Sequence, residues 1–310
     1  MADRTGRRLF VQAGSRAAVA VRERALLGSP IRARRSLFSL LLRRKTSAAG
    51  LVLCLLIACA AVFAPLLTPY DPVAIAPTMI LKGPSSSHWL GTDELGRDVL
   101  TRIIFGARVS VSVGAIAIVI ALCSGVVLGM VAGYYGGALG SVIMRLMDAL
   151  AAFPAVLLAL AVLSALGPGI RNAMIAIGVV YIPAFTRIMR GSVLTVKQNE
   201  YVEAARASGA TTPYLMRRAI FPNCISPLLV HASIGFANAI IVEAALSFLG
   251  LGAQPPMPSW GAMLNDGRQF VSQNVWYSVS AGSAIFFSVL GLNLLGDGLR
   301  DILDPRLRTT

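Results

Sequence analysis

A carboxylate inside a long apolar segment is the residue of this chain best placed for chemistry. Glu243 lies within the run from Ile225 to Leu249, and Asn238 and His231 precede it in the same run. A charged side chain at the centre of a membrane helix costs about 2.5–3.5 kcal/mol on insertion scales, so such a residue is a functional candidate. These three residues could line a wet path that accepts the ammonium group of a solute. Alternatively, Glu243 is hydrogen-bonded to a neighbouring helix and serves the fold.

A second polar group is a predicted pair of short helices between two apolar runs. The stretch from Glu203 to Ser208 predicts the first helix, and Gly209 suits the left-handed position that ends it. Thr212 would then cap the second helix, with proline following at its first position. A polar helix pair contributes little to folding in lipid, so its simplest use is to dock another protein.

Residues that would support an enzyme are sparse. The four cysteines lie in or beside apolar runs without a CxxC pair, and the two histidines are not at ligand spacing. No HExxH motif, Ser/His/Asp arrangement or GxxxxGK[ST] loop is recognisable. We therefore expect no catalytic site, no metal site and no bound cofactor on this chain. Any ATP-driven work must come from another subunit.

The composition predicts the element that positions these residues, the membrane-spanning helix. Of the residues, 56% are hydrophobic and only 14% are charged. A helix of about 20 apolar residues crosses the hydrocarbon core. Six runs satisfy this length: residues 48–68, 109–131, 143–166, 172–189, 225–249 and 275–295. We therefore expect an all-α integral membrane protein with six transmembrane helices.

One uncharged stretch, residues 109–144, is too long for a single crossing and should contain a span and a turn near 133–137. Its glycines include the pairs Gly129/Gly133 and Gly136/Gly140, spaced four residues apart. Such pairs let helix backbones approach closely. The alternative is that these glycines merely break the helix.

The basic residues predict the orientation, because cytoplasmic segments near membrane ends hold an excess of Lys and Arg. With the amino terminus inside, 22 of the 28 basic residues fall on the cytoplasmic side. We therefore expect both termini and the polar helix pair in the cytoplasm. The predicted regions are a basic cytoplasmic tail (1–47), a first transmembrane helix (48–68), an extracytoplasmic loop with an amphipathic helix (69–107), a five-helix core (108–297) containing a cytoplasmic loop (195–224), and a C-terminal tail (298–310).

The net charge of +14 raises the question of nucleic acid as a partner. Much of this charge lies in the first 45 residues, where basic residues bracket apolar patches. That pattern is typical of an interfacial helix on anionic lipid. No recognition module accompanies the charge, so we expect membrane lipid and not nucleic acid as the partner.

The predicted extracytoplasmic loop ends in a charged segment. Thr92 would cap an amphipathic helix from Asp93 to Ile104. Asp93, Arg97 and Asp98 could form a docking surface for an external protein, or the helix could be a simple interfacial lid. A calcium loop is not expected, because the acidic residues lack the alternate-residue spacing of such loops.

Four segments together resemble the inner-membrane permease subunit of a bacterial ATP-binding-cassette importer. They are residues 88–98, residues 147–148 with 153–154, residues 203–222, and residues 246–252 with 258–261. The resemblance covers roughly residues 48–308. It is to the second permease of the dipeptide/oligopeptide family, which has nickel and glutathione branches. Phe221 stands where the family pattern usually has leucine.

This resemblance implies a type I importer permease fold and the import of dipeptides or oligopeptides, with nickel or glutathione as alternatives. In that family the cytoplasmic loop is a coupling helix that fits a groove on the ATPase subunit. The role is carried to Glu203, Ala204, Ala205, Gly209, Ile220 and Pro222. The implied partners are a second homologous permease, one or two ATPase subunits that bind ATP and Mg, and an extracytoplasmic solute-binding protein. The implied location is the bacterial inner membrane.

Two other classes of membrane protein remain as alternatives. An ion-coupled secondary transporter would place coupling charges in related halves of the chain. No repeated half is recognisable, and the polar helix pair would then have no role. A non-transporting scaffold would leave the polar residues around Glu243 unexplained.

Overall fold

The computed structural model describes residues 41, 42 and 44–303, and this part of the chain consists of helices joined by turns and loops, with one isolated bridge between Thr92 and Asp98. Most of the predicted basic tail lies outside the described residues. The helical elements, in chain order, are α3 (Lys45–Leu67), η1 (Pro77–Met79), α4 (Val99–Tyr135), α5 (Gly137–Ala151), α6 (Ala155–Leu166), α7 (Ile170–Val196), α8 (Glu200–Ala207), α9 (Thr212–Tyr214), η2 (Leu215–Ile220), α10 (Phe221–Phe248), α11 (Trp260–Gly267), η3 (Arg268–Phe270) and α12 (Val275–Leu303).

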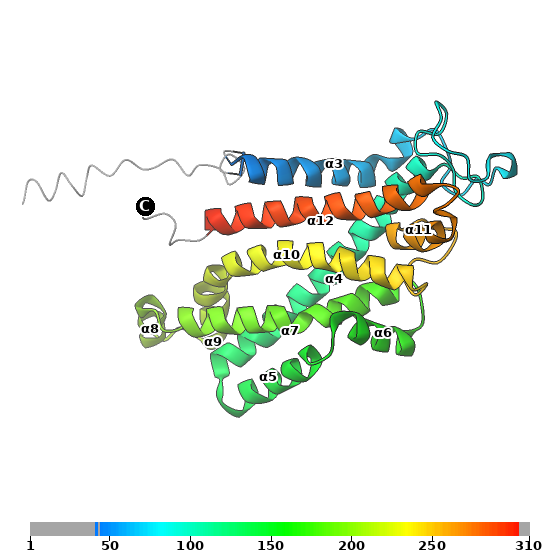
Figure 1. Ribbon diagram of the computed structural model, residues 1–310. Coiled ribbons are helices and arrows are strands. Elements are labelled where there is room, and N and C mark those ends of the chain that lie inside the picture. Colours follow the sequence, from blue (N-terminus) through cyan, green and yellow to red (C-terminus); the bar gives the residue numbers. More distant parts are fainter. Residues whose placement is uncertain (1–40, 43, 304–310) are drawn as a thin grey trace, which may run out of the picture. The chain divides into compact units, whose positions relative to one another are not determined.

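The long helices form a bundle in which α4 and α7 share the most extensive contact. Helix α3 packs on α12 and α4, and α10 packs on α12, α4 and α7, as Figure 1 shows for the helices that lie side by side. Glycines of α4 make the α4–α7 contact close. A Cβ atom at Gly129 would lie 2.5 Å from the Thr186 carbonyl oxygen, and one at Gly133 would lie 2.8 Å from Val193 Cβ. These two glycines therefore act as one of the two predicted close-approach pairs, whereas nothing lies within 4 Å of a Cβ built on Gly136.

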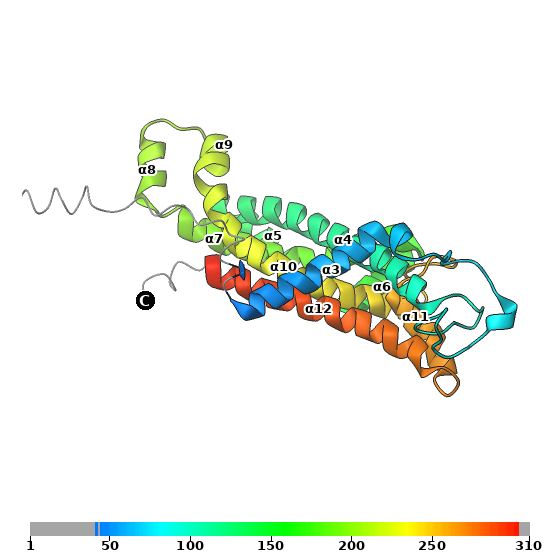
Figure 2. The ribbon, with the colours of Figure 1, turned by 90° about the horizontal axis from the view of Figure 1, so that it is seen from above.

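The two ends of the bundle carry different elements, and we call them the α8 end and the loop end. The α8 end carries α8 and α9 together with the start of α3 and the last turn of α12 (Figure 1). The loop end carries the connection from α3 to α4 and helix α11. Figure 2 shows α8 and α9 as a hairpin that stands across the direction of the long helices, to one side of the bundle at the α8 end.

The structure corrects the third predicted span. Five helices among the described residues are long and apolar enough to cross a membrane, and a sixth crossing is made only if the pair α5 and α6 counts as one span. This pair is bent by 96° instead of forming one straight helix over residues 143–166. The bend falls at Phe153 and Pro154, because proline disfavours helical geometry in the residue before it.

Two long helices extend into predicted flanking regions. Helix α4 begins at Val99, inside the predicted loop 69–107, which was expected to contain an amphipathic helix. Helix α12 continues to Leu303, so the start of the predicted tail 298–310 is helical. In both cases the helix extends past the apolar stretch because polar residues at its ends are tolerated outside the hydrocarbon core.

Candidate functional site

The α8 hairpin is formed by α8, a tight turn, α9 and the π-helical turn η2 that leads into α10. Its base is held by three buried apolar residues: Val202 and Ile220 are fully buried and Leu215 is 1% exposed. The Tyr201 hydroxyl also donates to the Ala219 carbonyl at 3.3 Å. A short polar helix is not stable alone in water, so these contacts fix α8 against η2.

Gly209 makes the turn between the two helices. Its φ is +84°, its N–H donates to the Arg206 carbonyl at 3.0 Å, and Ala210 N–H donates to the Ala205 carbonyl at 3.1 Å. This is the predicted left-handed end of the first helix. No atom lies within 4 Å of a Cβ built on Gly209, so the backbone angle, and not space, requires glycine here.

The six predicted coupling residues separate into two groups. Glu203, Ala204 and Gly209 are exposed on the hairpin, and Pro222 is exposed in the first turn of α10. Ala205 is half-buried and Ile220 is buried, so these two serve the base of the hairpin. The second helix begins one residue earlier than predicted, with Thr211 and not Thr212 as its N-cap.

Sequence reasoning overlooked other exposed residues of the hairpin. Tyr201 is 46% exposed and Tyr214 is 55% exposed. Arg206, Arg217 and Arg218 are also exposed. Aromatic residues and arginine are enriched in protein interfaces, so two tyrosines in an otherwise polar loop were a usable signal.

The loop end is organised around a buried carboxylate, Asp93. Its Oδ1 accepts hydrogen bonds from the backbone N–H groups of Leu95 and Arg97, both at 2.9 Å. Its Oδ2 accepts from Arg97 Nε at 2.7 Å and lies 3.3 Å from Arg102 Nε. Arg97 also donates to Glu94 Oε1 at 2.6 Å. Two arginines of the loop therefore converge on one fully buried carboxylate.

Asp98 is the second organising residue and corrects the predicted helix from Asp93 to Ile104. Its Oδ2 accepts from the Thr101 N–H and hydroxyl, each at 2.7 Å, so Asp98 and not Thr92 caps α4. Residues 92–98 instead close a turn in which Gly96 has a φ of +76°. A residue in the left-handed region cannot continue a right-handed helix.

The predicted docking residues Asp93, Arg97 and Asp98 are 0%, 6% and 6% exposed. Their polar atoms therefore bond within the chain. The exposed groups at this end are different and include Trp89, which is 72% exposed. A large aromatic residue on a loop far from any apolar run was a signal that the sequence offered.

Glu243, the intramembrane carboxylate, is 1% exposed. Its Oε1 accepts from the Ser247 hydroxyl at 2.8 Å, and Ser247 Oγ in turn accepts from the Ala253 N–H at 3.3 Å. This chain of bonds joins the end of α10 to the connection that follows it. The bonded partner of Glu243 is therefore on its own helix, and not on a neighbouring helix as the alternative expected.

The structure does not bring the three predicted path residues together. His231 packs edge-on against Phe185, with 5.1 Å between ring centroids. It is 12 residues from Glu243, or roughly 18 Å along the helix at 1.5 Å per residue. Asn238 is exposed, as is Ile241 one turn later. Of the three, Asn238 is exposed and Glu243 is buried, whereas His231 is half-buried and lines a separate cavity of about 520 Å³ with Asn223 and Arg300.

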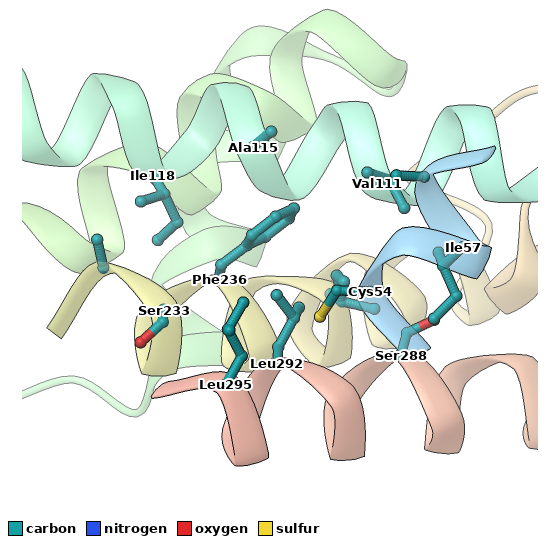
Figure 3. Close-up of a pocket in the computed structure, with 13 residues that line it drawn as sticks. Cys54, Ile57, Val111, Ala115, Ile118, Ser233, Phe236, Ser288, Leu292 and Leu295 are labelled. Carbon is teal, nitrogen blue, oxygen red and sulfur yellow. The ribbon is translucent and has the colours of Figure 1, made fainter. Parts of the chain in front are cut away.

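An apolar cavity of about 460 Å³ lies on the other side of α10, among α3, α4 and α12. Figure 3 shows Phe236 lying across it, between Ala115 and Ile118 on one side and Leu292 and Leu295 on the other. The non-hydrocarbon side chains of the lining are those of Cys54, Ser233 and Ser288. A polar solute would lose its hydrogen bonds to water here without replacement, so this cavity is not suited to conduct one.

Comparison with known proteins gives the family of this chain. Residues 125–309 match the family described as "Binding-protein-dependent transport system inner membrane component". Residues 35–84 match the N-terminal transmembrane domain of oligopeptide transport permease C. The chain belongs to the family of binding-protein-dependent inner-membrane transport components. It is therefore a multi-pass inner-membrane permease subunit, and the family is one of non-catalytic membrane subunits.

Curated relatives match nearly the whole chain. A dipeptide transport system permease protein of Alkalihalophilus pseudofirmus is 44% identical over 275 residues, covering 89% of this chain and 90% of the relative. A di/tripeptide transport system permease protein of Pseudomonas aeruginosa is 46% identical, with coverage of 85% and 89%. A glutathione transport system permease protein of Pectobacterium atrosepticum is also 46% identical, with coverage of 84% and 87%.

Solved structures show the same fold. An inward-facing structure of the MetNI methionine ABC transporter has a chain that superposes with a TM-score of 0.54 at 16% sequence identity. The match covers 66% of this permease chain and 97% of that one. The expected all-α importer permease fold is therefore confirmed.

Proposed function

We propose that this permease subunit imports dipeptides or oligopeptides delivered by an extracytoplasmic binding protein. The support is the agreement of relatives at 44–46% identity, two of which are named for dipeptide or di/tripeptide transport. The third is named for glutathione, itself a peptide. Nickel and glutathione remain the alternative cargoes within this family.

The α8 end is proposed to face the cytoplasm, with both termini on that side. The support is the distribution of charge, because 22 of the 28 basic residues fall on that side. The hairpin then projects towards the cytoplasm, where ATPase subunits carrying ATP and Mg would bind it. Glu203, Ala204 and Gly209 present the exposed contact, while Ala205, Ile220 and Val202 transmit its movement to α10 through the buried base.

The translocation path is proposed to run along the outside of this chain, against a second homologous permease. The support is that the cavity of Figure 3, among α3, α4, α10 and α12, is apolar and unsuited to a polar solute. The exposed face of α10 offers Asn238. Glu243 and His231 then support the helix that lines the path, and they do not contact the solute together.

At the loop end, the binding protein is proposed to dock on exposed groups such as Trp89. Asp93, Arg97 and Asp98 would fix the shape of that surface from beneath. This assigns the three predicted docking residues an indirect part in docking. A large exposed aromatic side chain is the kind of residue that becomes an interface anchor.

The proposed cargo is tested by uptake in a strain that lacks this gene. Labelled dipeptide, glutathione and nickel are supplied separately, and the strain is complemented with the wild-type gene or an empty vector. We expect dipeptide uptake to be lost and to return only with the gene. Loss of glutathione or nickel uptake alone would replace the proposed cargo. Normal entry of all three in a strain shown to lack other peptide importers would contradict the proposal.

A further inference from the structure

A polar cavity of about 560 Å³ lies at the loop end, between the Asp93 loop and the connection from α10 to α11. Its charged lining residues are Glu94, Arg97, Arg102 and Asp266. Three side-chain amides also line it, those of Gln254, Asn265 and Gln269. The chemistry therefore differs from that of the apolar cavity of Figure 3, which offers no charge.

The charges of this cavity do not balance. Arg97 and Arg102 both lie against Asp93, which is fully buried behind the lining. With Glu94 and Asp266 there are then three carboxylates for two guanidinium groups. Two of the carboxylates face the cavity, so the excess negative charge is placed where a ligand could meet it.

The same two carboxylates keep unused hydrogen-bonding capacity. Glu94 Oε1 accepts from Arg97, but its Oε2 is buried without a partner in the described part of the chain. A buried acceptor without a partner is unfavourable, so a bound ligand that supplied a donor to Glu94 Oε2 would relieve this cost.

Asp266 shows the same imbalance. Among residues 44–303 it has no hydrogen-bond or ion-pair partner that would neutralise it. Burial raises the pKa of the Asp266 carboxyl, as do the charges of Glu94 and Asp93, against the opposing effect of Arg102 and Arg97. A cation beside it would favour its ionised form.

We propose that this cavity is a binding site for a primary ammonium group, such as the amino terminus of a peptide. Asp266 and Glu94 Oε2 would accept the ammonium hydrogens, and the amides of Asn265 and Gln269 would bond to polar groups beyond it. The peptide assignment rests on the proposed function, because it places the cavity on the side from which solute arrives. The ammonium site itself rests on the lining alone.

The test uses a cysteine placed in the cavity and two thiol reagents of opposite charge. Asn265→Cys in the full chain, in native membranes, is treated with 2-aminoethyl or 2-sulfonatoethyl methanethiosulfonate, and the chain without the added cysteine gives the background. We expect the amine reagent to react faster than the sulfonate. Adding Asp266→Asn or Glu94→Gln should lower the ratio of the two rates by about fivefold, the effect of one nearby charge. The matched exposed carboxylate change, Asp71→Asn, should leave the ratio unchanged.

A protection arm addresses the peptide. Alanyl-alanine should slow labelling of Asn265→Cys, whereas N-acetyl-alanyl-alanine, which lacks the ammonium group, should not. A rate ratio that ignores both Asp266 and Glu94, or equal protection by the two peptides, would overturn the ammonium site. Absence of protection by either peptide would overturn the peptide assignment. Normal dipeptide uptake without the gene, in a strain that lacks other peptide importers, would overturn the transport proposal while leaving the labelling ratio intact.

Discussion

The two polar ends of the bundle use charge in opposite ways. At the loop end, charged residues are buried and bonded to one another, as Asp93, Arg97 and Arg102 show with exposures of 0–6%. At the α8 end, the hairpin keeps its charged residues exposed and is held by buried apolar residues at its base. At the loop end, buried charges therefore hold the loop in shape. At the α8 end, exposed charges form part of the surface that a partner would contact.

The two ends differ because burying a charge costs free energy, whereas exposing it does not. A buried ion pair repays its desolvation only when its geometry is complete, and removing one partner leaves the other uncompensated. An exposed charge costs the fold little and remains free to bind a partner. We therefore expect substitutions at the loop end to act on stability, and substitutions on the hairpin to act on coupling.

The largest effect on stability is expected from Asp93→Ala. The change leaves Arg97 and Arg102 without their shared carboxylate and two N–H groups without an acceptor. Loss of a partner in a buried pair costs about 3–5 kcal/mol. A strongly lowered thermal midpoint of the purified chain in detergent is the expected measurement. Asp71→Ala, at an exposed position of the same loop, should change stability by less than about 0.5 kcal/mol. Equal effects of the two changes would break the comparison.

A smaller effect is expected from Asp98→Ala, which removes the cap of α4. The Asp98 carboxylate accepts two hydrogen bonds from Thr101, and its Oδ1 lies 2.9 Å from His88 Nδ1. Loss of an N-cap costs about 0.5–2 kcal/mol. The thermal midpoint should fall, but by less than in Asp93→Ala. Asp98→Asn should recover part of the loss, because asparagine also caps helices. No recovery with asparagine would show that charge, and not capping, is what Asp98 supplies.

The smallest effect is expected from Asp266→Asn, and its sign is opposite. Burial raises the pKa of this carboxyl above its ordinary value of 3.8, so at pH values between the unfolded and folded pKa the folded state binds more protons than the unfolded state. Stability is therefore lost as pH rises from about 3.8 through the folded pKa. The asparagine variant avoids this loss, so its thermal midpoint should exceed that of the wild type at neutral pH. The difference should shrink as pH is lowered. A variant less stable than the wild type at pH 7 would indicate a partner for Asp266 in the assembled transporter.

Local signals explain what could be predicted from the sequence. Apolar length identified the long helices, and the turn chemistry of Gly209 identified the hairpin, because both depend on residues close in sequence. The Asp93 cluster could not be found in this way. Its geometry depends on Arg102, on Asn274 Nδ2, which donates to the Thr92 carbonyl at 2.9 Å, and on Gly96, where a Cβ would lie 1.9 Å from the Ala76 carbonyl oxygen.

Glu243 shows a different limit of sequence reasoning. An intramembrane carboxylate predicts either a path or a bond to the fold, and no local pattern separates the two. The hydrogen bond to Ser247 and the 1% exposure of the side chain are visible only in the structure. Likewise, the periodicity of α10 did not say that Asn238 would lie on its open face. Both depend on which helices pack around α10.

The central claim is that the hairpin turn at Gly209 couples this permease to an ATPase. The most direct test compares uptake by Gly209→Pro and Gly209→Asn variants that reach the membrane in equal amounts. Asparagine tolerates a φ of +84°, whereas proline has a fixed negative φ and loses the N–H bonded to Arg206. We predict that the proline variant loses at least about tenfold in transport rate, while the asparagine variant stays within about twofold of wild type. Normal transport by the proline variant would contradict the claim.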